Sequence, residues 1–246
     1  EWTTQEKLIG FSHSANIYAT ETFHAGSSVP LARVTMPTVT YEYAGSTRTV
    51  DDYMQREKVA GLLVMKDGKI ALERYAHGIN DRTLWESKSI AKSVLSTLVG
   101  IALKEGKIGS LDDAVDDPRY IPELQTSAYH GVTIRNMLRM ASGVEWKESP
   151  YEDPTSDSYY ILATCIGNRT PGCTLDRMLS LPRAVDPVTG QPVEQGTVWH
   201  YNTGEAFLTG LLLQRATGMS IAEYLEKKLW KPAHMERDGV WMRESD

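Results

Sequence analysis

Ser89 and Lys92 have the side-chain types and the spacing of a nucleophile and its base. They are three positions apart, so on a helix their side chains lie on one face. A serine hydroxyl is a weak nucleophile until a base removes its proton. A lysine can be that base if burial or nearby positive charge lowers its pKa. The ordinary alternative is a serine that caps a helix and a lysine at the surface.

Residues 90–103 are predicted to form the helix that positions this pair. Apolar side chains cover most of its circumference, which is typical of a buried helix. Lys104 in the last turn and Gly106 just beyond it indicate where the helix stops. The positive potential at the start of the helix would favour negative charge that develops near Ser89.

The loop 196–204 leads into a second predicted helix and supplies another candidate group. Tyr201 has short polar neighbours and could point into a cleft. There its phenol could pass protons between a nucleophile and a leaving group. A packing tyrosine with its hydroxyl in water is the alternative. We interpret Trp199 as a cleft wall or a core residue, and His200 as a structural histidine or a residue that tunes Tyr201.

The composition excludes several classes of function. The chain has 246 residues and a net charge of −6, a soluble globular composition without the basic runs of a nucleic-acid-binding protein. No apolar stretch reaches membrane-spanning length. The Gly-x-Ser-x-Gly motif of α/β-hydrolases, a phosphate-binding glycine loop and a His-Glu-x-x-His motif are all missing. We expect no metal or organic cofactor.

Two cysteines, Cys165 and Cys173, are separated by a turn-rich segment. Their spacing fits no zinc pattern, which leaves a disulfide that closes a small loop or two free thiols. The turn residues favour the disulfide, and hence a periplasmic or secreted protein rather than a cytoplasmic one.

The order of predicted elements indicates one domain over residues 1–246, with a mixed fold. An irregular arm over residues 1–50 precedes a sheet hairpin within 59–88, and residues 89–232 are mainly helical. The hairpin turns at Asp67-Gly68, a strong tight-turn signal. Because two strands alone make a marginal sheet, we expect further strands beside it. These would come from chain beyond residue 246, from a C-terminal fragment or from a homodimer partner.

Short motifs in one order give the chain a resemblance to a known superfamily. Ser89-Ile90-Ala91-Lys92 resembles the first motif of the serine β-lactamases and penicillin-binding proteins. Tyr201-Asn202-Thr203 resembles the Tyr-x-Asn motif of their class C-like branch. Residues 109–113 and 132–143 resemble segments that connect these motifs, and the likeness extends over residues 59–232.

Within that superfamily the chain is most similar to the 6-aminohexanoate-dimer hydrolase group and related carboxylesterases. There a loop tyrosine next to an Asp-Pro assists amide cleavage, and Tyr151-Glu152-Asp153-Pro154 is similar. The resemblance implies an α/β fold of the β-lactamase/transpeptidase type, with an antiparallel sheet flanked by helices and an all-helical lobe. It also implies a serine hydrolase that cleaves a small-molecule amide or ester through an acyl-enzyme.

The resemblance also implies roles for particular residues. Ser89, Lys92 and Tyr201 would be catalytic, whereas Tyr151, Thr203 and Trp199 would bind substrate. The backbone N–H of Ser89 would give half of an oxyanion hole.

The sequence departs from the superfamily pattern in two ways. Thr203 stands where asparagine is usual, and no Lys-Thr-Gly-like strand is found up to residue 246. That strand normally supplies an oxyanion-hole donor, whose loss typically costs a factor of about 100 to 1,000 in rate. Alternative interpretations remain: a β-lactamase, a D-amino-acid peptidase, or a non-catalytic relative that binds ligands or takes part in assembly.

Overall fold

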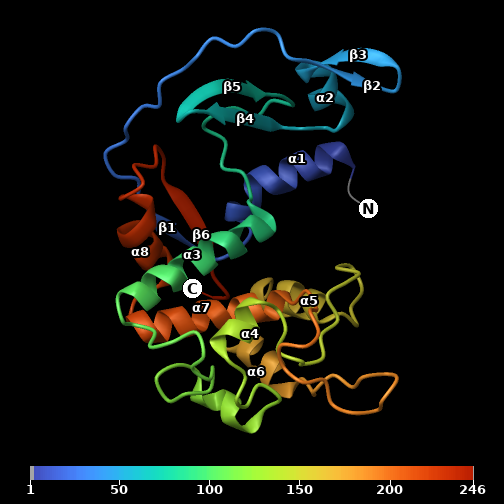
Figure 1. Ribbon diagram of the computed structural model, residues 1–246, viewed down its shortest axis with the longest axis vertical. Coiled ribbons are helices and arrows are strands. Elements are labelled where there is room, and N and C mark those ends of the chain that lie inside the picture. The colour runs from blue at the N-terminus through green and yellow to red at the C-terminus, as the bar shows by residue number, and fades with distance from the viewer. Residues whose placement is uncertain (1–2, 246) are drawn as a thin grey trace. The chain divides into compact units, whose positions relative to one another are not determined.

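A computed structural model describes residues 3–245, in which helices are combined with small antiparallel sheets (Figure 1). The predicted mixed α/β class is therefore confirmed. Contacts divide the chain into two compact units. The first contains the residues up to Ser14 together with Ser28–Glu86, and the second contains Ala15–Ser27 and the residues from Ser87 onward. The expectation of one catalytic domain over residues 1–246, of which residues 1, 2 and 246 lie outside the described part, stays a prediction.

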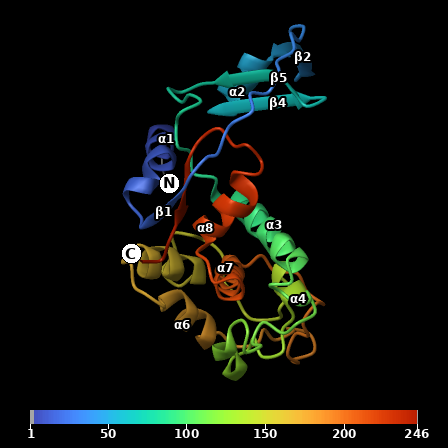
Figure 2. The same ribbon diagram turned by 90° about the vertical axis from the view of Figure 1, so that its left-hand side faces the viewer.

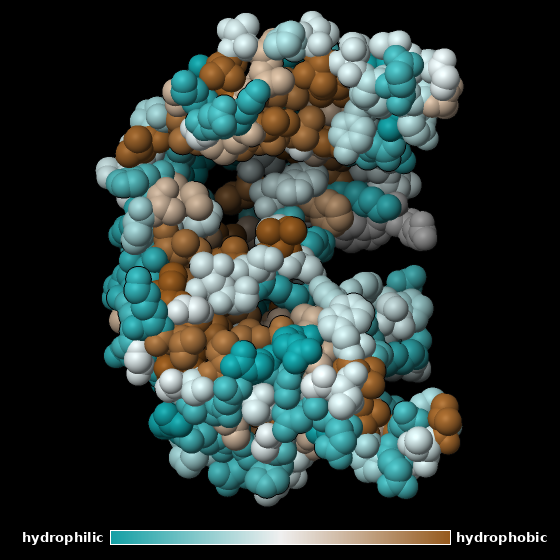
Figure 3. Space-filling view, in the orientation of Figure 1, coloured by the Kyte–Doolittle hydropathy of each residue, from teal (hydrophilic) through white to brown (hydrophobic). Residues whose placement is uncertain are grey.

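The first unit combines two helices with two hairpins. Its elements are α1 (Thr4–His13), β2 (Thr40–Tyr43), β3 (Ser46–Thr49), α2 (Val50–Arg56), β4 (Gly61–Lys66) and β5 (Lys69–Tyr75). The β4–β5 hairpin turns at Asp67 and Gly68, which both have a positive φ, as the Asp-Gly pair predicts. The segment around Arg33 forms a parallel bridge to Ile70. Apolar side chains gather on the surface of this unit (Figure 3), and Leu63 is more than half exposed.

The irregular arm predicted over residues 1–50 is wrong in part, because the helix α1 lies within it. Residues 1 and 2 of this arm lie outside the described residues. Thr3 and Glu6 form a capping box, in which each side chain accepts the backbone N–H of the other residue. No side chain of α1 is buried, so the apolar periodicity that would have revealed this helix is missing.

The second unit is mainly helical and carries all of the predicted catalytic residues. A 3₁₀ turn (Lys88–Ile90) leads into α3. The other helices and strands of this unit are β1 (Thr20–Phe23), α3 (Ala91–Lys104), α4 (Ile134–Leu138), α5 (Asp157–Tyr159), α6 (Cys173–Ser180), α7 (Thr203–Thr217), α8 (Ile221–Leu225) and β6 (Gly239–Met242). Residues Tyr160–Ile166 and Glu226–Trp230 continue α5 and α8 as π-helical turns.

The core of the second unit lies where α3 packs against α7, and the two helices are neighbours in both views (Figures 1 and 2). Leu98 and Ala102 of α3 and Leu212 of α7 are completely buried. The expectation that the 90–103 helix is buried nearly all round is wrong, because α3 packs through one side. Ile90 is 69% exposed.

The last helix or strand in the described part of the chain is a strand that the sequence did not suggest. Strand β6 pairs antiparallel with β1, so that Thr20 lies opposite Met242 and Phe23 opposite Gly239. Strands after the hairpin were expected only from outside residues 1–246, and β6 shows that this expectation is wrong. The four residues of β6 are each half-buried, so no clear alternation marks them. Elsewhere in this unit, Cys165 and Cys173 form the expected disulfide.

Candidate active site

The start of α3 brings the serine and the lysine together as the spacing predicts. Lys92 Nζ donates a hydrogen bond of 3.0 Å to Ser89 Oγ. Ser89 itself lies in the 3₁₀ turn that precedes α3, and Lys88 before it has φ 46°. A left-handed residue other than glycine is strained by about 1–2 kcal/mol, and such strain collects at functional sites. The sharp turn exposes Ser89 while Lys92 stays half-buried.

The loop that carries Tyr201 is fastened to the segment after α4. The N–H of Gly196 donates to Ala141 O at 2.7 Å, and the N–H of His200 donates to Met140 O at 2.9 Å. From this anchored loop the Tyr201 hydroxyl donates to Ser89 Oγ at 2.7 Å. The structure therefore brings the three side chains predicted to be catalytic together around one oxygen atom.

Thr203 is the first residue of α7 and lies beside the same lysine. Asn202 caps the helix by accepting the N–H of Glu205 at 3.0 Å. This cap sets the first turn of α7, from which Thr203 Oγ1 accepts a bond of 3.3 Å from Lys92 Nζ. Thr203 stands where the superfamily motif usually has asparagine, and its hydroxyl lies within hydrogen-bond distance of Lys92.

Glu148 is the central residue of this site that the sequence analysis missed. Its carboxylate accepts bonds from the Thr203 N–H at 2.9 Å, the Thr203 hydroxyl at 2.5 Å, the Tyr151 hydroxyl at 2.8 Å and the Trp146 indole at 2.5 Å. Four donors fill the four lone-pair positions of an ionised carboxylate. The acidic loop just before Tyr151 was the only signal that could have pointed to it.

Tyr151 and Trp199 lie around this group in different ways. Tyr151 is 49% exposed and reaches the site through Glu148, not through Ser89. Burial, and then the hydrogen bond to Glu148, raises the pKa of the Tyr151 phenol, so the hydroxyl keeps its proton at neutral pH. Trp199 is 67% exposed, with its ring centre 6.3 Å from that of Tyr201. The side chain of Trp199 is therefore at the surface and not in the core.

The arrangement can do nucleophilic chemistry at a carbonyl group. Ser89 Oγ has one neighbour that can remove its proton, Lys92, and one that can carry a proton onward, Tyr201. Within residues 3–245, no three His, Cys, Asp or Glu side chains are grouped so that they could hold a metal ion.

A buried acid lies on the first turn of α7 beside the site. The side chain of Glu205 is 2% exposed and receives a long bond of 3.4 Å from the Tyr129 hydroxyl. Within residues 3–245 its Oε2 has no hydrogen-bond partner. Glu205 lines a cavity of about 120 Å³ together with Asn202 and Trp146. Burial raises the pKa of Glu205 to about 8, against the lowering effect of the Ser142 and Tyr129 hydroxyls.

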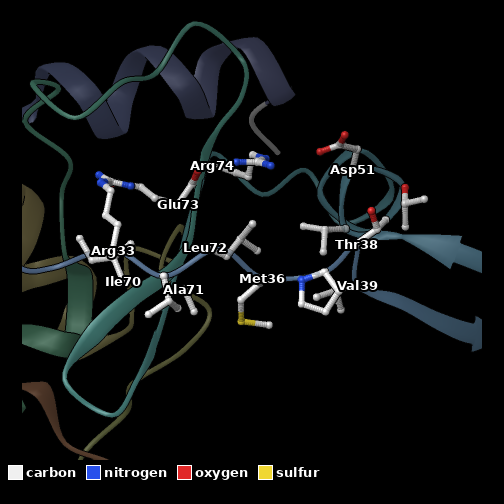
Figure 4. Close-up of a pocket in the computed structure, with 14 residues that line it drawn as sticks. Arg33, Met36, Thr38, Val39, Asp51, Ile70, Ala71, Leu72, Glu73 and Arg74 are labelled. Atoms are coloured by element: carbon white, nitrogen blue, oxygen red, sulfur yellow. Dashed lines mark hydrogen bonds and ion pairs between the residues drawn. The ribbon is translucent and has the colours of Figure 1, made fainter.

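The first unit contains a larger hollow of about 390 Å³, which has a different lining (Figure 4). It is bordered by residues 33–39, the start of α2 and strand β5, with Met36 and Leu72 among its apolar walls. Arg33 and Glu73 form an ion pair at its edge. None of the predicted site residues belongs to this lining.

The fold and the site together define a class of protein that comparison with known families identifies. Residues 47–246 match the family model described as Beta-lactamase, so the chain belongs to the β-lactamase family. The resemblance inferred from the Ser89 and Tyr201 motifs is thereby confirmed.

Individual relatives share part of their length with this chain. The 6-aminohexanoate-dimer hydrolase of Paenarthrobacter ureafaciens is 27% identical over 181 residues, which cover 72% of this chain and 43% of that enzyme. A β-lactamase of Providencia stuartii is 31% identical over 115 residues, which cover 42% of this chain and 29% of that protein. The chain thus spans less than half the length of these curated relatives.

Solved structures with the same fold include members of both groups. A candidate 6-aminohexanoate-dimer hydrolase from Bacillus anthracis superposes with a TM-score of 0.80 over 96% of this chain and 61% of that one, at 18% identity. A class C β-lactamase in complex with cefoxitin gives a TM-score of 0.52 over 73% of this chain and 46% of that one, at 22% identity. At these identities the likeness concerns the fold alone. No helix within the described part of the chain combines the length and apolar character needed to cross a membrane.

Proposed function

We propose that the protein is a serine hydrolase that cleaves amide or ester bonds through an acyl-enzyme. One observation carries this proposal: Ser89 Oγ lies 3.0 Å from Lys92 Nζ and 2.7 Å from the Tyr201 hydroxyl. Both distances suit proton transfer in a transition state. The catalytic roles of the three residues are part of the proposal.

In the first half-reaction Ser89 Oγ forms a bond to the substrate carbonyl carbon while Lys92, in its neutral form, takes the hydroxyl proton. The carbonyl oxygen becomes an oxyanion, which the Ser89 N–H would help to stabilise. Tyr201 then passes a proton to the leaving amine or alcohol as its bond to carbon breaks. Water then attacks the acyl carbon and gives a proton to the Tyr201 phenolate. The bond between that carbon and Ser89 Oγ breaks, and Lys92 returns its proton to Ser89.

We infer that linear amides and short esters are better substrates than β-lactams. The name of the Paenarthrobacter relative and the position of Tyr151 support this preference. The Tyr151 hydrogen is directed at Glu148, so its phenol oxygen is left to accept a hydrogen bond from a substrate N–H. A β-lactamase or a D-amino-acid peptidase would use the same nucleophile, so the substrates that the protein turns over distinguish these alternatives.

The decisive experiment is fluorophosphonate labelling of the full-length protein, followed by mass spectrometry of the labelled peptide. We expect an adduct on Ser89 and turnover of p-nitrophenyl acetate and of the linear 6-aminohexanoate dimer above that of nitrocefin. Ser89→Ala should abolish both labelling and turnover. Ser93→Ala, a change to an exposed serine on α3, should change neither. An unlabelled Ser89 would favour the non-catalytic relative that binds ligands.

We also infer that the protein is exported to the periplasm or secreted. The disulfide between Cys165 and Cys173 supports this location, because disulfides persist in oxidising compartments. The inference can be tested by treating the protein isolated from its native cells with a thiol-alkylating reagent, with and without prior reduction. A protein whose two thiols react without reduction would belong to the cytoplasm.

A further inference from the structure

The carboxylate of Glu148 ends a line of hydrogen bonds that begins at Lys92. Lys92 Nζ donates to Thr203 Oγ1 at 3.3 Å, and the Thr203 hydroxyl donates to Glu148 Oε1 at 2.5 Å. Glu148 Oε2 also accepts the Thr203 N–H at 2.9 Å. Two bonds to a single residue fix both the backbone and the side chain of Thr203, and thus the direction in which its hydroxyl points.

The direction of that hydroxyl matters because threonine can both donate and accept. A Thr203 hydroxyl free to rotate could turn its hydrogen toward the lone pair of a neutral Lys92. That lone pair must instead accept the proton of Ser89. With its only hydrogen bonded to Glu148, the Thr203 oxygen faces Lys92 as an acceptor.

We propose that Glu148 is a positioning residue for Lys92, which acts through Thr203 by holding its hydroxyl as an acceptor. One N–H of Lys92 is then directed at Thr203, and its lone pair stays available to Ser89. This role rests on the proposed hydrolase function and deepens it. It also accounts for a threonine where the superfamily motif usually has asparagine, since an amide can offer an oxygen acceptor without a second residue to orient it.

The proposal predicts that Glu148 and Thr203 act as one unit. Residues that share one interaction show non-additive effects, whereas independent residues show effects that multiply. The rate at which a fluorophosphonate labels Ser89 reports on nucleophile activation alone, without a leaving group of the substrate. Measured from pH 5 to 10, it gives a plateau rate by which variants can be compared.

The test is to compare the plateau rate of Ser89 labelling in the full-length wild type, Glu148→Gln, Thr203→Val and the double variant. Glu148→Gln should lower the plateau by about 10- to 100-fold, since a misplacement of about 1 Å can cost about 100-fold. The double variant should label no more slowly than Thr203→Val. Glu152→Gln, a change to an exposed glutamate of the same loop, should match the wild type.

Plateau losses that multiply in the double variant would overturn the proposal. Glu148 also bonds the Trp146 indole, so thermal unfolding checks that each variant folds. Should Glu148→Gln not fold, the Thr203 variants decide: Thr203→Ser must label faster than Thr203→Val, and equal rates overturn the role. A wild type that is not labelled at Ser89 is a separate result, which removes the hydrolase proposal itself and this one with it.

Discussion

The Tyr201 hydroxyl donates to Ser89 Oγ at 2.7 Å, although 112 positions of sequence separate the two residues. The anchored loop before α7 and the turn before α3 set this distance together, and both belong to the second unit. The two helices that follow these segments, α3 and α7, pack against each other through buried leucines. The placement of the phenol is therefore a property of the helical core and does not depend on the loop alone.

Replacing Tyr201 by phenylalanine should separate its proton transfer from its packing. The ring remains and the hydroxyl is lost, so we expect kcat on p-nitrophenyl acetate to fall by about 100-fold or more, with a smaller change in KM. Steady-state kinetics measures this. Tyr43→Phe makes the same change on an exposed tyrosine in β2 and should leave kcat unchanged. A Tyr201→Phe enzyme within threefold of the wild type would contradict the role.

Replacing Lys92 by arginine should distinguish a base from a fixed positive charge. Arginine keeps the charge but does not lose its proton in proteins, so it cannot accept the proton of Ser89. We expect Lys92→Arg and Lys92→Ala to have equally low acylation rates, about 100-fold or more below that of the wild type. Stopped-flow measurement of the p-nitrophenol burst reports acylation directly. Lys104→Arg, on the last turn of the same helix, serves as the control. An arginine variant that recovers the burst would show that charge alone suffices.

Local signals predicted the elements that hold the site. The stop of α3 near Gly106 follows from short-range backbone chemistry. So does the Asp67-Gly68 turn, which belongs to the first unit and not to the site. The proximity of Ser89 and Lys92 also follows from helical spacing, since it requires only one turn of backbone.

Long-range relationships were beyond the same reasoning. The bonds from Glu148 to Thr203 join segments 55 positions apart, and β1 meets β6 from opposite ends of the chain. Nothing in the residues around Glu148 indicates which donors will surround it after folding. The Tyr201 contact to Ser89 was predicted only because the order of motifs resembled a known superfamily.

The buried acid Glu205 predicts how stability changes with pH. Its pKa is raised to about 8 in the folded state from an ordinary value of 4.5, so the folded state binds this proton more tightly than the unfolded state. The stabilisation that comes from holding this proton on Glu205 is fully present below about pH 4.5, and it is lost as the pH rises toward 8. At pH 7 the cost is about 3 kcal/mol in the free energy of unfolding.

Urea unfolding of the wild type and Glu205→Gln at pH 5, 7 and 8 measures this loss. The difference between the two proteins cancels the other titrating groups, and it should shift in favour of the glutamine variant as the pH rises. Glu152→Gln, at an exposed site, should show no such shift. A wild type that gains stability relative to Glu205→Gln between pH 5 and 8 would contradict the raised pKa.

Two glycines of α7 should respond to alanine in opposite directions. A Cβ at Gly204 would clash with Met178 Sδ and would lie 2.9 Å from the Trp146 ring, whereas one at Gly210 would meet no described atom within 4 Å. Gly204→Ala should therefore destabilise the fold by about 1–3 kcal/mol, since added volume in a packed core forces side chains off their rotamers. It should also slow acylation, because it displaces the turn that carries Thr203. Gly210→Ala should stabilise the protein by about 0.5–1 kcal/mol through helix propensity, with acylation unchanged. Thermal unfolding and burst kinetics on both variants measure these effects, and equal responses would mean that the start of α7 is not packed as tightly as described.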